Sequence, residues 1–108
     1  MNKLFAIVVL LAVMVPAQDR QRITGVITDS MCATGDHSAM RMGPTDAECT
    51  KACVEGHGVA YVLYDGKDAY YLDDQKTPEK FAAKKVVVTG TLDAAKKSIH
   101  VESMTAAQ

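Results

Sequence analysis

Five side chains that can bind a metal ion or exchange disulfides lie within one short stretch of the sequence. They are Cys32, His37, Cys49, Cys53 and His57, and they include all three cysteines of the chain. Thiolates and imidazoles gathered at one point are ligands that Zn²⁺ and Cu⁺ take from proteins. The three cysteines with His37 would complete a closed tetrahedral site, and His57 is the alternative histidine. The pattern therefore predicts a zinc or copper site, with a structural or a metal-handling role and a metal ion as partner.

The spacing of these residues favours one shared site. Residues 45–48 form a Thr-x-x-Glu capping box directly after a proline, so a helix should start there and run to about residue 55. Cys49 and Cys53 are four residues apart on that helix and project from one face. Cys32 and His37 lie on the preceding loop, which is long enough to fold back over this face.

Three methionines, Met31, Met40 and Met42, lie in the same loop. Thioethers are soft ligands and would favour Cu⁺ over Zn²⁺. The alternative is that these flexible side chains fill gaps over a small core. The sequence leaves both interpretations open.

The first 17 residues have the three parts of a secretory signal. Lys3 supplies the positive charge, residues 4–15 are an unbroken apolar run, and Val15 and Ala17 are small residues before a cleavage site. The run is shorter than the roughly 20 residues of a spanning helix. We therefore expect a signal peptide at 1–17 and a periplasmic or secreted protein. An uncleaved anchor is the alternative, and it would be the chain's only membrane contact.

Export makes a disulfide the main alternative to a metal site, because cysteines in oxidising compartments are usually paired. A bond from Cys32 to Cys49 or Cys53 would staple the loop to the helix and leave one thiol over. The chain would then be a disulfide-stapled binding module for an unknown partner. A thiol redox protein is a third hypothesis, with Cys49 best placed in the first helical turn. The Cys-x₃-Cys spacing is not the Cys-x₂-Cys of thioredoxin-like enzymes, and no catalytic residue is indicated.

Short β-branched and aromatic runs predict five strands around the helix. The helix should follow the first strand, and a short helical turn capped by Thr77 should precede the fourth. The expected strands cover residues 23–29, 59–64, 69–72, 85–92 and 98–102. Gly25 and Gly90 fall inside strands, as in sharply bent barrels. We predict an α+β fold, a small five-stranded OB-like β-barrel, forming one domain over residues 18–108. An open sheet covered by one helix is the alternative.

The charge balance argues against nucleic acid as a partner. The chain has 12 Lys and Arg residues against 13 Asp and Glu residues, a net charge of −1, and so lacks the basic excess that binding to phosphates requires. The Gly-x-Ser-x-Gly elbow of many hydrolases does not occur in the sequence.

The cysteine segment also resembles a known group of proteins. Its specific part reads Asp-Ser-Met-Cys at 29–32, then His37, then Glu-Cys-Thr-Lys-Ala-Cys at 48–53. Together with the strand-like runs at 61–66 and 87–92, it is similar to small exported bacterial domains without an assigned function, some of which have glycine where this chain has Ala33. The resemblance implies an OB-like barrel and a common role for Cys32, His37, Cys49 and Cys53. It implies no reaction.

Overall fold

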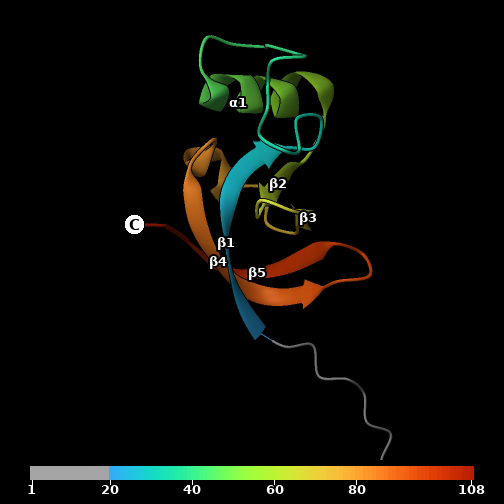
Figure 1. Cartoon of the computed structure of the whole chain (residues 1–108), viewed down its shortest axis with the longest axis vertical. Coiled ribbons are helices and arrows are strands. Elements are labelled where there is room, and N and C mark those ends of the chain that lie inside the picture. Colours follow the sequence, from blue (N-terminus) through green and yellow to red (C-terminus); the bar gives the residue numbers. More distant parts are fainter. Residues whose placement is uncertain (1–19) are drawn as a thin grey trace, which may run out of the picture.

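The computed structural model describes residues 20–108, so the predicted signal segment lies outside the described residues. In this part of the chain the elements follow one another in the predicted order (Figure 1). They are β1 (Arg20–Asp29), α1 (Asp46–His57), β2 (Tyr61–Tyr64), β3 (Ala69–Leu72), the 3₁₀ helix η1 (Thr77–Phe81), β4 (Lys85–Asp93) and β5 (Ser98–Ala106).

The strands close into a barrel in the order β1-β2-β3-β5-β4. β3 and β5 run parallel, and every other neighbouring pair is antiparallel. This confirms the predicted small α+β barrel with one helix inserted after the first strand, and the open-sheet alternative is wrong. No helix in the described part of the chain is long and apolar enough to cross a membrane.

Alternating residues of the strands fill the barrel interior. The interior is built from apolar side chains of all five strands, namely Ile27, Tyr61, Leu63, Leu72, Val86, Val88, Ile99 and Met104. Thr28 and its cross-strand partner Val62 belong to the opposite face of the β1–β2 pair, yet both are fully buried. The barrel therefore has a second buried layer on the outside of β1, under the following loop.

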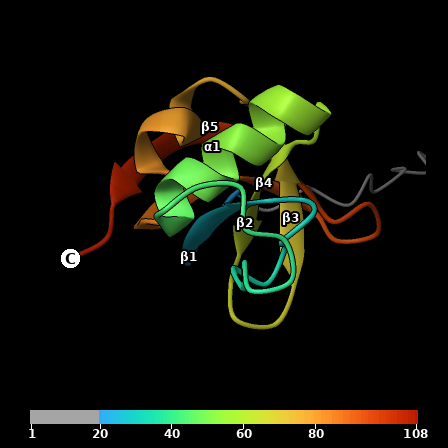
Figure 2. The same ribbon diagram turned by 90° about the horizontal axis from the view of Figure 1, so that it is seen from above.

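Helix α1 lies across the end of the barrel where β1 finishes (Figures 1 and 2). Thr45 caps its first turn by accepting the N–H of Glu48 at 3.1 Å, as predicted. Gly58, in the left-handed region at φ 64°, ends the helix two residues later than expected. The buried residues of α1 are Cys49, Thr50 and Cys53. Two thiols and a hydroxyl thus face the barrel, and the half-buried Val54 packs against its apolar core.

The structure also differs from the sequence expectations at η1 and β5, and β1 begins at Arg20, three residues before the expected start. Thr77 is the first residue of η1 rather than its cap, since the carboxylate of Asp74 accepts the N–H groups of Lys76 and Thr77. β5 continues to Ala106, beyond the expected residue 102, because it follows β4 around the barrel past a bulge. Sequence alternation ends at the bulge although the strand pairing does not.

Candidate metal centre

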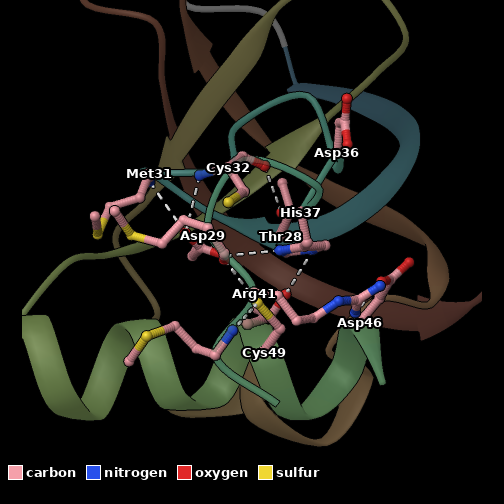
Figure 3. Close-up of polar contacts among 12 residues, drawn as sticks. Thr28, Asp29, Met31, Cys32, Asp36, His37, Arg41, Asp46 and Cys49 are labelled. Atoms are coloured by element: carbon pink, nitrogen blue, oxygen red, sulfur yellow. Dashed lines mark hydrogen bonds and ion pairs between the residues drawn. The ribbon is translucent and has the colours of Figure 1, made fainter. Parts of the chain in front are cut away.

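Three potential metal ligands from β1 and its following loop meet in the second buried layer. Asp29 is the last residue of β1, and Cys32 and His37 lie on the loop (Figure 3). One ligand atom from each lies within 4.8 Å of the other two. The three residues expose 0%, 7% and 4% of their surface. We call these residues the Asp29 centre.

The carboxylate of Asp29 fixes the start of the loop. Its Oδ1 accepts the N–H of Met31 at 3.1 Å and the N–H of Cys32 at 3.0 Å. The hydroxyl of Thr28 donates to the carbonyl oxygen of Cys32 at 2.7 Å. Cys32 is therefore held through both of its backbone polar groups, while Oδ2 of Asp29 remains free to face His37 (Figure 3).

His37 lies between helix α1 and the carboxylate of Asp29. Its Nε2 is 3.4 Å from Oγ1 of Thr50, and its Nδ1 is 3.9 Å from Oδ2 of Asp29. If Nε2–H donates to Thr50, then Nδ1 directs a lone pair toward Asp29. Histidines that bind metals usually donate the far N–H to a carboxylate, a carbonyl or water, and the hydroxyl of Thr50 would take that place here.

Oδ2 of Asp29 and Nδ1 of His37 have no hydrogen-bond partner among the described residues, and both are buried. Their separation of 3.9 Å is too long for a hydrogen bond. Leaving a buried polar atom without a partner costs about 1–3 kcal/mol. A cation bound between the two atoms would satisfy both of them.

The helix presents its two cysteines to this layer. Cys49 and Cys53 are both fully buried, and all three cysteines of the chain are free thiols. The Sγ of Cys49 accepts the N–H of Met42 at 3.2 Å and donates to the carbonyl oxygen of Met40 at 3.4 Å. The loop backbone thus folds over the helix face, as the sequence predicts.

The thiols near the Asp29 centre hold their protons more firmly than ordinary cysteines. Burial raises the pKa of Cys53 to about 11, and the charge of Asp29 and the neighbouring Cys49 and Cys32 add to the increase. Burial, followed by the charge of Asp29, also raises the pKa of Cys32. A metal ion must therefore displace these protons, and neither residue has the low pKa of a reactive redox thiol.

The structure places the two candidate histidines in different environments, with His37 buried and His57 exposed. Cys32 and His37 come together as expected, with Cys49 and Cys53 on the facing helix. His57 is the last residue of α1, is exposed, and lies outside the Asp29 centre. Sequence reasoning missed Asp29. The available signal was an acidic residue at the end of a strand, three positions before a cysteine.

Comparisons of the chain with protein-family models, curated proteins and solved structures find no match. The proposed function therefore rests on the donor atoms of the Asp29 centre, on their burial and on their hydrogen bonds.

The raised pKa of Cys53 predicts its reactivity. In the folded, metal-free protein, alkylation of Cys53 by iodoacetamide should be slow at neutral pH and should accelerate toward pH values near the pKa of about 11, because the thiolate is the reacting form. Peptide mass spectrometry gives the rate for each cysteine, with urea-unfolded protein as the control of ordinary reactivity. Fast alkylation of folded Cys53 at neutral pH would contradict this and favour the redox hypothesis.

Proposed function

We propose that this chain is an exported, metal-binding domain that holds Zn²⁺ at the Asp29 centre in a structural role. The observation that carries the proposal is the pair of buried atoms without partners, Oδ2 of Asp29 and Nδ1 of His37, which face each other across 3.9 Å. Cys32 supplies a thiol to the same group. Residues 1–17 support export, by their resemblance to a signal peptide.

The mixture of donor atoms favours zinc. Zn²⁺ accepts carboxylate oxygen, imidazole nitrogen and thiolate sulfur in one site. Cu⁺ prefers sulfur and imidazole and gains little from a carboxylate, whereas Mg²⁺ and Ca²⁺ prefer oxygen and avoid thiolate. Among common ions, Zn²⁺ fits the oxygen of Asp29, the sulfur of Cys32 and the nitrogen of His37 together.

A tetrahedral zinc site needs a fourth donor, and we assign it to Cys53, which lies outside the close group of Asp29, Cys32 and His37. Its thiol is fully buried and feels the charges of Asp29 and Cys32. The sulfur of Cys49 is instead engaged by the loop backbone at Met40 and Met42. Zinc bound by Asp29, Cys32, His37 and Cys53 would tie β1, the loop and α1 together.

Burial supports a structural role over a catalytic one. Catalytic zinc sites keep one position open to water or substrate. The residues of the Asp29 centre are at most 7% exposed. Of the residues of α1, Val54 is half-buried and packs against the apolar core, while the fully buried side chains are two thiols and a hydroxyl. A metal at this point would therefore add to what holds the helix in place.

Zinc binding by single variants tests the proposal. We expect one Zn²⁺ per chain by elemental analysis and native mass spectrometry, and a sulfur-to-metal absorption band when Co²⁺ replaces Zn²⁺. Asp29→Asn, His37→Gln and Cys53→Ser should each weaken zinc affinity by at least roughly 10–100-fold. That is the loss found when a residue that hydrogen-bonds a metal ligand is replaced. His57→Gln is the matched control at an exposed histidine and should bind as the wild type does.

Two results would overturn the zinc centre. One is unchanged zinc affinity in His37→Gln together with a loss in His57→Gln. The other is periplasmic protein that contains no metal and has a mass lower by two hydrogens, which would mean a disulfide. That second result would favour the disulfide-stapled binding module.

A further inference from the structure

The loop over the buried thiols carries an unusual exposed surface. Met31, Met40 and Met42 expose 41%, 41% and 40% of their surface. Among the described residues, the only other exposed large apolar side chain is that of Tyr71. The three methionines therefore do not fill the core, and their thioethers are accessible from solvent.

Two of these methionines flank a buried thiol. The N–H of Met42 donates to Sγ of Cys49 at 3.2 Å, and the same sulfur donates to the carbonyl oxygen of Met40 at 3.4 Å. The backbones of both residues are thus in contact with the sulfur. A methionine side chain is unbranched, with three rotatable bonds, so either thioether can turn from solvent toward Cys49.

The charge of Arg41, the cation nearest in sequence to Met40 and Met42, is neutralised by an ion pair. Between the two methionines, Arg41 directs its guanidinium to Asp46, with an N···O distance of 2.8 Å. Figure 3 shows this ion pair on the side of the loop away from Met31. The positive charge of Arg41 is therefore paired, and the sulfur of Cys49 keeps an N–H donor that can also serve a metal-bound thiolate.

We propose that Met40, Met42 and Cys49 form a binding site for Cu⁺, with Met31 as a further thioether on the same loop. Two thioethers and a thiolate are the soft donor set that selects Cu⁺ over Zn²⁺. Binding replaces the thiol proton of Cys49 with the metal and releases that proton to water, with no change in oxidation state. The site is separate from the Asp29 centre and shares no ligand with it.

The exposure of the thioethers suits exchange of the ion. Cu⁺ can reach the thioethers of Met40 and Met42 from solvent. Contact with the sulfur of Cys49, which is fully buried, then requires the loop backbone at Met40 and Met42 to move aside. A site of this kind accepts Cu⁺ from another protein that binds the ion through thiolate or thioether sulfur, and can return the ion to it. In the Asp29 centre, by contrast, no donor residue is more than 7% exposed, so that no exposed side chain can take up the ion first.

Competition for Cu⁺ tests the site in the zinc-loaded mature chain. Under anaerobic conditions, Cu⁺ is titrated against a chromogenic Cu⁺ chelator while zinc release is followed. We expect one equivalent of Cu⁺ to bind with zinc retained. The double variant Met40→Leu/Met42→Leu keeps the apolar bulk and should bind Cu⁺ at least about tenfold more weakly. Met104→Leu, a change at a buried methionine of the barrel, is the matched control.

Two outcomes overturn the proposal. The first is Cu⁺ affinity in the folded double variant equal to that of the wild type. The second is release of one zinc for each Cu⁺ bound, which would place Cu⁺ at the Asp29 centre. If the chain binds no zinc at all, the same Cu⁺ titration can be made on metal-free Cys32→Ser protein, with and without Met40→Leu/Met42→Leu. The comparison still measures whether Cu⁺ affinity depends on Met40 and Met42. Failure of the zinc centre and failure of the copper site are therefore distinguishable.

Discussion

Zinc is expected to raise the free energy of unfolding by about 4 kcal/mol when free Zn²⁺ is a thousandfold above its Kd. The buried side chains through which α1 faces the barrel are those of Cys49, Thr50 and Cys53, beside the half-buried Val54. Zinc at the Asp29 centre would bind only the folded chain, in which these donors come together. Urea unfolding at buffered zinc concentrations, followed by circular dichroism, measures the difference.

The stabilisation by zinc should decrease as the pH is lowered from about 8 to about 6, because protons compete with the metal for thiolate and imidazole. The metal-free protein should behave differently. The pKa of Cys53 is raised from 9.0 to about 11 in the folded state, so its contribution to stability is complete below pH 9 and is lost as the pH rises toward 11. The stabilisation by zinc therefore changes between about pH 6 and 8, whereas the contribution of Cys53 in the metal-free protein changes between about pH 9 and 11.

The variant Asp29→Asn serves as the control for zinc-dependent stability. At the same zinc concentration, a roughly 10–100-fold weaker Kd should reduce the stabilisation of this variant to about 1.4–2.7 kcal/mol, whereas His57→Gln should respond as the wild type does. An equal midpoint for the wild type with and without zinc would contradict the structural role that we propose.

Substitution of Gly90 is expected to have the second large effect. A Cβ at this position would collide with the carbonyl oxygen of His100, in the β4–β5 pairing next to the bulge. The strands would have to separate, and overpacking by even one methyl group costs about 1–3 kcal/mol. We expect Gly90→Ala to lose at least about 3 kcal/mol, and Gly90→Val to prevent folding of the barrel.

Gly56→Ala is the matched control. Gly56 lies within α1, and an added Cβ would meet nothing within 4 Å. Alanine stabilises helix interiors by about 0.5–1 kcal/mol relative to glycine. Thermal unfolding should therefore show opposite signs for the two glycine-to-alanine changes. Equal midpoints for Gly90→Ala and the wild type would mean that the strands at the bulge are not closely paired.

Much of the local structure is determined by the sequence alone. The capping box at 45–48 specifies the start of α1, since it satisfies the first free N–H groups of the helix wherever the helix lies. The five β-branched or aromatic runs all form strands. Their number, and the helix after the first, favoured the barrel, because five short strands can bury their apolar faces by closing on themselves. The open sheet stayed an alternative until the pairing of β1 with β4 closed the barrel.

The composition of the site was decided by tertiary structure. Both His37 and His57 are close enough in sequence to reach the cysteines, and only the packing of the loop against α1 buries one and leaves the other in solvent. Asp29 ends a strand, where a carboxylate is ordinarily solvated. Its burial depends on a loop that folds back and donates two N–H groups to it. Such contacts join residues that no sequence period relates. The cysteines therefore stood out in the sequence, whereas the position of Asp29 before Cys32 was only a weak signal until the fold buried its carboxylate beside them.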